Sequence, residues 1–393
     1  STLVTNINWE APNVTISDKP RYGWRGLHLD CSRHFFTIEQ IQQLMYWMAL
    51  HKLNVFHWHL TDDQGWRFES KLYPKLNEIS TVRIEKDNTP YGPYIYTQEE
   101  IKNLISYAKT LNITIVPEID LPGHSCAALA AYPEFACGFN APYKVKNTWG
   151  IFPEIYCVGN ENAVKFLKDI LTEVISVFDS EFIHIGGDEC KFGNWQKCPK
   201  CQEAKKKSGF LHNFDLFYSF IRDIAKFINQ QGRKMIGWNE CIADDFLIPE
   251  GNAGMVWQDS SCAPYVTDEC NRKAVMTPMN YLYFDHCQYD FSYHDEHKYI
   301  GGFSPLEKVY EYDPCTDVTN TANVLGCQAN VWCEFIPDFL DAQWKIFPRM
   351  CALSEIAWTE LEKKDFKQFK QSLDNTHLKR LDIMNIKYAN LQS

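Results

Sequence analysis

Residues 182–189 read Phe-Ile-His-Ile-Gly-Gly-Asp-Glu, an apolar run that ends in two glycines and two carboxylic acids. The β-branched and aromatic side chains predict a buried strand over residues 182–187. Asp188 and Glu189 then stand at the carboxyl end of that strand, and helical periodicity appears further on, at residues 214–230. The stretch therefore predicts a strand followed by a helix, with two acids at the turn after the strand.

The same unit recurs along the whole chain. Short apolar or β-branched runs predict further strands at residues 24–30, 53–60, 113–119, 234–239, 255–258, 281–285 and 324–332. Helical patterns between them include residues 38–50, 98–111, 163–178 and 342–358. Strands that alternate with helices pair in parallel through right-handed crossovers, and about eight such units close into a barrel. We therefore expect the α/β fold class, as a (β/α)8 TIM barrel.

Acids, tryptophans and a tyrosine follow the predicted strands. In chain order the strand ends carry Asp30 with Arg33, Asp62 with Asp63, Glu118 with Asp120 and His124, Asp188 with Glu189, Trp238 with Asn239 and Glu240, Trp257 with Gln258, Tyr283 with Asp285, and Trp332 with Glu334. A closed barrel gathers these ends on one face, where such barrels place catalysis. Any single acid could instead cap the following helix, but the recurrence at every strand end predicts one pocket.

The residue types of this predicted pocket suit a sugar. Indole rings stack on the C–H faces of pyranoses, and carboxylates with one arginine form hydrogen bonds to hydroxyl groups. Paired carboxylates are also the usual means of glycoside hydrolysis, with Asp188 and Glu189 as the candidate pair. Because neighbouring strand residues point to opposite sides, these two are not expected to flank the scissile bond together. One of them therefore needs a different role.

Composition narrows the functional classes. With 393 residues and 45% hydrophobic content the chain can bury a large core, which excludes intrinsic disorder. The formal net charge of −11 argues against nucleic acid and anionic membrane surfaces as partners. The sequence has no apolar run long enough for a membrane span, and any signal peptide is expected to have been removed before Ser1.

Cysteines and glycosylation motifs indicate in which cellular compartment the protein is expected. Fifteen cysteines are many for a reducing cytosol, and N-glycosylation motifs start at Asn13 and Asn112. We expect a lysosomal, vacuolar or secreted glycoprotein with disulfide bonds, and a cytosolic enzyme with buried thiols is the alternative. Cys198 and Cys201 have the spacing of zinc ligands, but the sequence shows no second pair. They are interpreted as a local disulfide or as two thiols.

Beyond these patterns, the run from His184 to Glu189 resembles the signature of the family 20 glycoside hydrolases, the β-N-acetylhexosaminidases. Matching motifs, in order, are RGLHLD at residues 25–30 with SRH at 32–34, HWHLTDDQ at 57–64, PEIDLPGH at 117–124, GWNE at 237–240, VWQ at 256–258, YFD at 283–285 and WCE at 332–334. The resemblance covers most of the chain. It implies catalysis in which the 2-acetamido group of the substrate is itself the nucleophile.

The resemblance implies a role for each residue of the pocket. Glu189 is the general acid, Asp188 holds the acetamido nitrogen and stabilises the oxazolinium charge, and Tyr283 donates to the acetamido oxygen. Tyr281 is the alternative donor. The other implied roles are walls of the sugar site at Trp238, Trp257 and Trp332, hydroxyl binding by Arg33, Asp285 and Glu334, and a relay from Asp62 through His124 to Glu189, with Asp63 as the alternative to Asp62.

The implied enzyme is a retaining, exo-acting β-N-acetylhexosaminidase without a cofactor. Its substrates are terminal β-linked GlcNAc or GalNAc of glycoconjugates or chitin oligosaccharides. Relatives usually carry an α/β domain before the barrel, so residues 1–20 are expected to be its remnant or linker, and residues 21–393 the barrel with C-terminal helices. A homodimer and a separately held N-terminal fragment are the expected protein partners.

Two other functions stay open at the level of the sequence. The first is a sugar-binding barrel that has lost catalysis, although the presence of both Asp188 and Glu189 argues against it. The second is a metal-dependent hydrolase, whose ligands would be His57, His59, Asp62, His124 and Asp188. Tryptophans, rather than further histidines, follow the later strands and argue against that second reading.

Overall fold

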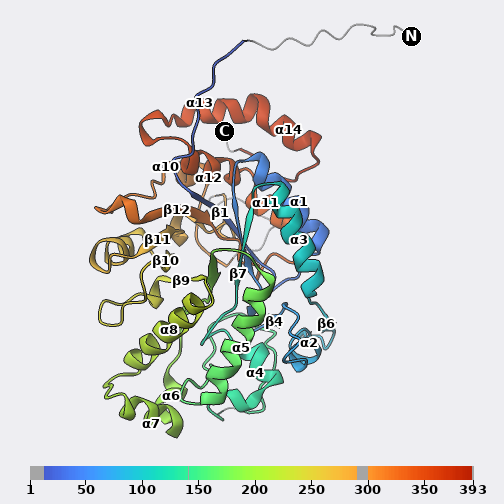
Figure 1. Ribbon diagram of the computed structural model, residues 1–393. Coiled ribbons are helices and arrows are strands. Elements are labelled where there is room, and N and C mark those ends of the chain that lie inside the picture. Colours follow the sequence, from blue (N-terminus) through green and yellow to red (C-terminus); the bar gives the residue numbers. More distant parts are fainter. Residues whose placement is uncertain (1–12, 140, 290–299, 392–393) are drawn as a thin grey trace.

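The computed structural model describes residues 13–139, 141–289 and 300–391, and its central feature is a closed barrel (Figure 1). The barrel strands are β1 Trp24–Asp30, β2 Val55–His59, β7 Thr114–Glu118, β8 Phe182–His184, β9 Lys234–Trp238, β10 Ala253–Val256, β11 Lys273–Met276 and β12 Val324–Ala329. Around the barrel they follow the order β1, β12, β11, β10, β9, β8, β7, β2, and each neighbouring pair is parallel. The predicted (β/α)8 barrel is therefore confirmed.

Helices surround the strands and extend both ends of the barrel (Figure 1). The longer ones are α1 Ile38–Leu50, α3 Gln98–Thr110, α5 Glu161–Val177, α8 Asn213–Gln230, α11 Phe339–Ile346 and α12 Arg349–Trp358. The shorter ones are α2 Lys75–Ile79, α4 Cys126–Ala131, α6 Gly193–Lys197, α7 Pro199–Lys207, α9 Met279–Leu282, α10 Leu306–Glu311, α13 Phe366–Ser372 and α14 Leu378–Ile383. Two small antiparallel sheets pair β3 Thr61–Asp62 with β4 Gly65–Trp66, and β5 Arg83–Ile84 with β6 Pro90–Tyr91.

The two ends of the barrel differ in what they carry. In Figure 1, α13 and α14 lie at the end where the chain enters β1, and α2, α4, α6 and α7 lie at the opposite end. That opposite end is the one to which the carboxyl ends of the strands point, because α4 and α6 follow β7 and β8 in the chain. The excursions on this face build the walls of the site described below.

Capping boxes mark the first residues of α1 and α3. Thr37 precedes α1, and its hydroxyl accepts from the backbone N–H of Gln40 while the Gln40 side chain accepts from the Thr37 N–H. Thr97 and Glu100 form the same reciprocal pair at the start of α3. Each capping box satisfies two backbone donors that a helix start leaves without partners. The predicted helices at residues 38–50 and 98–111 therefore begin where expected.

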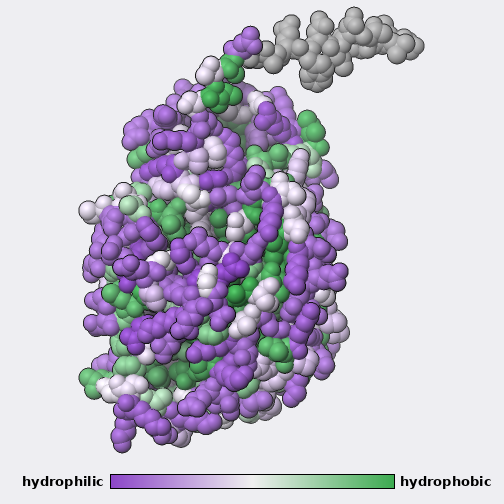
Figure 2. Space-filling model, in the orientation of Figure 1, coloured by the Kyte–Doolittle hydropathy of each residue, from purple (hydrophilic) through white to green (hydrophobic). Residues whose placement is uncertain are grey.

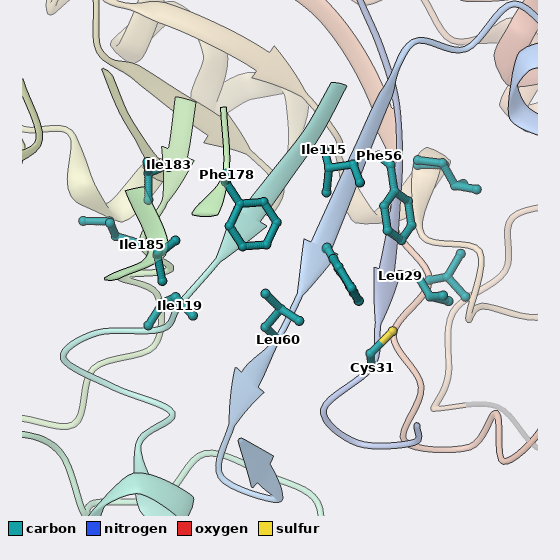
Figure 3. Packing of buried hydrophobic residues seen from close by; sticks show 14 of the residues in the cluster. Leu29, Cys31, Phe56, Leu60, Ile115, Ile119, Phe178, Ile183 and Ile185 are labelled. Carbon is teal, nitrogen blue, oxygen red and sulfur yellow. The ribbon is translucent and has the colours of Figure 1, made fainter. Parts of the chain in front are cut away.

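Side chains alternate along the strands between the barrel interior and the layer beneath the helices. Figure 3 shows Leu29, Phe56 and Ile115 from β1, β2 and β7 within the large core between strands and helices. Val55 and Val116, one position away, belong to a smaller cluster inside the barrel. This period of two is the geometry of strands in a barrel, where successive side chains point to opposite faces.

The seventh strand is where the prediction is wrong. The structure has β11 at Lys273–Met276, whereas the sequence favoured residues 281–285, which follow the barrel strand. Pro278 leads into α9, and Tyr283 forms only an isolated bridge to Asn330. The four-residue β11 runs between Arg272 and Thr277 and carries little pattern of its own, so the longer aromatic run misled the prediction.

Two other boundaries also differ from the predictions. The strand expected over residues 182–187 ends at His184, because Gly186 and Gly187 adopt left-handed φ angles of 65° and 91°. The helix expected over residues 342–358 is divided into α11 and α12. Pro348 precedes α12, and a proline cannot donate the backbone hydrogen bond that a continuous helix needs there.

The surface and the cysteines bear on the expected compartment and partners. The face shown in Figure 2 is mostly hydrophilic, with smaller hydrophobic areas between the polar ones. In the part of the chain that the structure describes, helices with both the length and the apolar character of a membrane span are absent. No disulfide bond joins cysteines among the described residues, so the expected disulfides are not found.

The packing of Phe56 leads to a first prediction. Its ring is fully buried between the strands and helices, so Phe56→Ala leaves a cavity that the surrounding side chains fill only in part. We expect a loss of about 3–5 kcal/mol in the free energy of unfolding, measured by urea denaturation. Tyr46→Ala, at an aromatic residue that is 47% exposed, is the control and should change stability by less than about 0.5 kcal/mol. Equal losses in both variants would contradict this account of the core.

Candidate active site

A cavity of about 300 Å³ lies at the carboxyl ends of the barrel strands. Its walls contain every residue for which the sequence predicted a catalytic or substrate-binding role. These residues are Arg33, Asp62, His124, Asp188, Glu189, Trp238, Trp257, Tyr283, Asp285, Trp332 and Glu334. They come from segments throughout the chain, so the barrel brings together side chains that are as much as about three hundred residues apart, as expected of its carboxyl face.

Asp188 and Glu189 both face this cavity, contrary to the expectation that they point to opposite sides. Strand β8 has already ended, and Glu189 itself has a left-handed φ of 51°. The preceding glycine Gly187 has no room for a side chain, since a Cβ there would lie 2.2 Å from Sγ of Cys241. This sharp turn replaces the strand alternation on which the prediction depended.

His124 lies between two pairs of carboxylates. Its Nε2 is 3.5 Å from Oε2 of Glu189 and 3.6 Å from Oδ2 of Asp188. Its Nδ1 is 3.3 Å from Oδ1 of Asp62 and 3.2 Å from Oδ2 of Asp63. Burial opposes a charge on the ring, but the surrounding carboxylates, Asp62 and Asp188 foremost, hold the pKa of His124 well above its ordinary value.

Both of the acids proposed as the relay partner of His124 therefore contact it. Asp63 also accepts the backbone N–H of Cys126 at the start of α4, so it contacts the start of a distant helix and not of α2, the helix that follows it in the chain. Asp62 alone of the two lines the cavity. Burial raises the pKa of Asp62, but Arg33 and His124 outweigh it and lower that pKa.

Arg33 is held rigidly at the cavity wall. Its guanidinium contacts Oδ2 of Asp62 at 2.8 Å and donates from Nε to Oε1 of Gln64 at 2.9 Å. It also lies over the ring of Trp332, with 5.2 Å between Cζ and the ring centroid. The buried Asp30 accepts the Arg33 backbone N–H and so shapes the turn that follows β1. A fixed, charged donor of this kind suits recognition of sugar hydroxyl groups.

Two acids in the cavity resist ionisation. Burial raises the pKa of Asp188 to about 7, with Glu240 and Glu189 adding to the rise and His124 opposing it. Burial and the nearby Glu334 raise the pKa of Asp285 to about 8. In both side chains Oδ1 is buried and has no hydrogen-bond partner among the described residues. Acids with a raised pKa and a buried oxygen that lacks a hydrogen-bond partner are typical of functional sites.

Aromatic rings form another wall of the cavity. The ring centroids of Trp238 are 5.8 Å from those of Trp332 and 6.4 Å from those of Trp257. Tyr283 stacks on Trp257 at a centroid distance of 6.2 Å and an interplanar angle of 16°. Tyr281, the alternative hydroxyl donor, instead stacks on Tyr312 and does not line the cavity. The position of Tyr283 therefore agrees with the first choice made from the sequence.

Beneath the cavity, the barrel interior holds a buried carboxylate among histidines. Glu118 lies 2.6 Å from Nδ1 of His59, 3.0 Å from Nε2 of His57 and 2.8 Å from Nδ1 of His184. Glu118 therefore has histidines as its ion-pair partners below the pocket. The guanidinium of Arg25 donates to backbone carbonyls of Tyr22 and Lys52 and contacts none of these groups.

These contacts also bear on the metal-dependent alternative. Side chains close enough to share a metal ion occur here, among them His57, Glu118 and His184. The histidines proposed as ligands, His57 and His59, contact Glu118 inside the barrel, while His124 contacts the acids of the cavity. His59 also contacts Asp62, 2.9 Å away, so the five proposed ligands lie along a series of contacts that runs from the barrel interior to the cavity. The cavity itself is lined by acids and indoles, which favours a sugar pocket over a metal centre.

The sequence missed several residues of the cavity wall. Asp120 lines it although no role in the site was assigned to it from the sequence, and its position at a strand end was the signal available. Gly150 and Ile151 also line it from the long loop between β7 and α5, where no periodicity marks them. Only folding of that loop against the barrel brings these two residues to the site.

The two predicted glycosylation sites lie away from this cavity. Asn13 precedes the barrel, and Asn112 occupies the turn between α3 and β7 with a left-handed φ of 56°. Both side chains are exposed. Their position leaves the carboxyl face of the barrel unobstructed.

The raised pKa of Asp285 predicts a stability that depends on pH. The unfolded chain ionises this acid near its ordinary pKa of 3.8, whereas the folded protein retains the proton up to about pH 8. Raising the pH through this range therefore destabilises the fold through Asp285. We expect Asp285→Asn to raise the thermal unfolding midpoint above that of the parent, and by more at about pH 8 than at about pH 5.

The control for this measurement is Asp245→Asn, at an exposed residue. It should shift the midpoint little at either pH, because an exposed carboxylate is well hydrated in both states. A gain for Asp285→Asn that is the same at both pH values would contradict the link to ionisation.

With this geometry established, comparisons show what the chain resembles. Residues 22–361 match the catalytic domain of glycosyl hydrolase family 20. A β-hexosaminidase of Porphyromonas gingivalis is 39% identical over 381 residues, which cover 96% of this chain and 48% of that relative. The chain therefore spans about half the length of that protein.

Solved structures show the same likeness. The crystal structure of a β-N-acetylhexosaminidase superposes with a TM-score of 0.88 at 29% identity, over 96% of this chain and 80% of that one. An exo-β-N-acetylglucosaminidase of Vibrio harveyi in complex with N-acetylglucosamine gives 0.82 at 30% identity, over 95% of this chain and 60% of the other. Since the family match spans residues 22–361 and includes every cavity residue predicted from the sequence, the chain belongs to glycosyl hydrolase family 20.

Proposed function

We propose that this protein is a retaining exo-β-N-acetylhexosaminidase that removes terminal β-linked GlcNAc or GalNAc through an oxazolinium intermediate. One observation carries the proposal: Asp188 and Glu189, neighbours in the chain, both line one cavity and both lie beside Nε2 of His124. The family membership and the relatives described above support the same activity. The substrates are glycoconjugates or chitin oligosaccharides.

The dimensions of the cavity support exo action. About 300 Å³ is at the lower end of the range of ligand sites, a size that suits one sugar ring better than a run of several. Trp238 is buried, whereas the side chain of Glu189 is 30% exposed. A terminal sugar would therefore enter with the rest of the glycan directed outward past Glu189.

Glu189 is proposed as the general acid and base. In the first step the acetamido oxygen attacks C1, the bond from C1 to the leaving oxygen breaks, and the proton of Glu189 passes to that oxygen. In the second step water attacks C1, the bond from C1 to the acetamido oxygen breaks, and Glu189 takes a proton from the water. The imidazole of His124 lies 3.5 Å from Oε2 of Glu189. Its positive charge stabilises the ionised form of Glu189 after the proton has left.

Asp188 is proposed to bind the acetamido group. Its buried Oδ1, without a hydrogen-bond partner among the described residues, is a suitable acceptor for the acetamido N–H. A carboxylate there stabilises the positive charge of the oxazolinium in a buried site. Tyr283 is the proposed donor to the acetamido oxygen, and Trp238, Trp257 and Trp332 enclose the methyl group.

Arg33, Asp285 and Glu334 are the proposed ligands of the outer hydroxyl groups. Arg33 is a fixed donor, and Oδ1 of Asp285 is an acceptor without a hydrogen-bond partner among the described side chains. Burial raises the pKa of Glu334 although Arg33 opposes the rise. Hydrogen bonds from sugar hydroxyl groups would offset the cost of burying these acids.

A compartment and partners belong to the proposal as well. Exposed glycosylation motifs at Asn13 and Asn112 support a lysosomal, vacuolar or secreted protein that carries N-glycans. A mass decrease after enzymatic removal of N-glycans from the native protein would test this. A homodimer and a separate N-terminal fragment are testable by sedimentation and mass spectrometry of the same material.

The competing function is a barrel that binds sugar without cleaving it. Release of nitrophenol from 4-nitrophenyl β-N-acetylglucosaminide distinguishes the two, because a binding protein releases none. We expect turnover by the 393-residue chain, and its absence between about pH 3 and pH 8 would favour the binding protein. Isothermal titration with N-acetylglucosamine would then show whether the site still binds.

Replacement of Glu189 tests the general acid. We expect Glu189→Gln to lower kcat/KM for 4-nitrophenyl β-N-acetylglucosaminide by about two to four orders of magnitude. The loss should be much smaller for a dinitrophenyl glycoside, because that leaving group departs without protonation. Glu250→Gln, at an exposed residue, is the matched control and should retain parental kinetics. Full turnover by the Glu189 variant would refute the assignment.

Replacement of Asp188 tests acetamido assistance separately. We expect Asp188→Asn to lower kcat/KM by about two to four orders of magnitude, since it removes a charge that stabilises the transition state. Unlike the loss in Glu189→Gln, this loss should persist with the dinitrophenyl glycoside, because leaving-group protonation is not what the variant lacks. Recovery of rate with the activated substrate would instead assign proton transfer to Asp188.

A further inference from the structure

Four cysteines that are well separated in the sequence meet at one point of the fold. Sγ of Cys157 lies 3.6 Å from Sγ of Cys198 and 3.5 Å from Sγ of Cys201. Sγ of Cys137 lies 3.9 Å from Sγ of Cys201. All four sulfur atoms lie within 4.8 Å of one another. The second pair that the sequence did not show beside Cys198 and Cys201 is therefore supplied by the tertiary structure.

Backbone contacts hold the four thiols together. An antiparallel bridge between Ala136 and Tyr156 holds together the two stretches that carry Cys137 and Cys157. The backbone N–H of Cys157 donates to the carbonyl of Phe135 at 2.8 Å. These contacts place two cysteines side by side on one segment, the loop between β7 and α5.

The other two cysteines belong to the start of α7. Cys198 is the residue immediately before this nine-residue helix, and Cys201 lies in its first turn. Gly159 packs directly against them, because a Cβ there would lie 2.4 Å from the backbone N of Cys201. The loop that carries Cys157 is thus in backbone contact with the helix start, and a side chain at Gly159 would separate them.

The sulfur positions match the geometry of a single metal ion. Zinc binds thiolates at about 2.3 Å in a tetrahedron, so neighbouring sulfur atoms are about 3.8 Å apart. The three separations of 3.5–3.9 Å agree with that edge length. They are much longer than the distance of about 2.05 Å in a disulfide. Iron–sulfur clusters also use four thiolates, but several iron atoms need more space between the sulfurs.

We propose that Cys137, Cys157, Cys198 and Cys201 bind one structural zinc ion. Three of the thiols are buried and Cys137 is half-buried, so the site is closed, as structural zinc sites are, and has no open position for a substrate. Each thiol releases its proton to solvent as it binds. The amide groups at the start of α7 favour the resulting negative charge on Cys198 and Cys201.

The ion joins the two segments that form one side of the cavity. The β7 to α5 loop carries His124, Gly150 and Ile151, and the segment after β8 carries Asp188 and Glu189. Hydrogen bonds join the same segments near the cysteines, from Nε1 of Trp195 to the Tyr156 carbonyl and from Nδ2 of Asn194 to the Pro153 carbonyl, both at 2.8 Å. A zinc ion would crosslink the two segments more strongly than these hydrogen bonds do. Its four cysteines are not among the residues that line the cavity.

Elemental analysis of the 393-residue chain, produced with zinc in the medium and then freed of loose metal, tests the site directly. We expect about one zinc ion per chain, and X-ray absorption with four sulfur ligands at about 2.3 Å. A paired variant, Cys198→Ser with Cys201→Ser, should lose the zinc. Cys262→Ser, at a half-buried cysteine outside the cluster, is the matched control and should keep it.

A second measurement applies if the paired variant fails to fold. Titration of the parental protein with an organomercurial, with a chromogenic chelator present, should release about one zinc per chain as the four thiols react. The metal-depleted protein should also show a lower thermal unfolding midpoint, which added zinc restores. Neither readout depends on glycosidase activity, so this proposal and the proposed function can fail separately.

Three results would overturn the zinc site. Zinc well below one per chain in protein grown with the metal is the first. A disulfide within the cluster, found by peptide mapping under non-reducing conditions, is the second. Stoichiometric iron in place of zinc, with the visible absorption of iron thiolate, is the third and would replace the assigned metal.

Discussion

Glu118, enclosed in the barrel and surrounded by histidines, is the charge on which the site above it depends. A carboxylate in so dry a place is costly unless it is paired and hydrogen-bonded. Burial works against its ionisation, but His184, His59 and His57 outweigh this and hold the pKa of Glu118 well below its ordinary value. One level of the barrel interior is therefore polar, with Glu118 and its histidines, while Val55 and Val116 belong to an apolar cluster inside the same barrel. Removing any one partner would leave the others with an uncompensated charge.

From this hub a continuous series of contacts runs up to the cavity. His59 contacts Glu118 through Nδ1 and Asp62, 2.9 Å away, through Nε2. Asp62 in turn contacts Arg33 and His124, and His124 lies beside Asp188 and Glu189. A charge at any point of the series is felt by its neighbours because water is excluded along it. The raised pKa values of Asp188 and Asp285 show the energetic cost of gathering acids in a buried pocket. A bound molecule that offers hydroxyl and amide donors to these acids would offset that cost.

Much of this arrangement could be predicted from the sequence, because local rules govern it. Short apolar and β-branched runs marked most of the barrel strands, and acids and indoles at strand ends marked the cavity. The prediction failed where a local signal was weak or overridden. Strand β11 has only four residues, so its apolar run is shorter and gives a weaker strand prediction than the aromatic run at residues 281–285. Asp188 and Glu189 face the same way because left-handed glycines end β8 early, a turn that the strand pattern did not anticipate.

The sequence by itself determined the fold class, the chemistry of the cavity and the identities of its charged and aromatic residues, since these follow from periodicity and from motifs contiguous in the chain. The tertiary structure alone decided which side chains meet. It brought Gly150 and Ile151 to the cavity wall, and it placed His57 beside Glu118 inside the barrel and His124 beside Glu189 in the cavity. It also brought the thiols of Cys137 and Cys157 close to those of Cys198 and Cys201. Contacts of this kind depend on how loops without periodicity pack against the barrel, and sequence spacing carries no information on distances that only long-range packing sets.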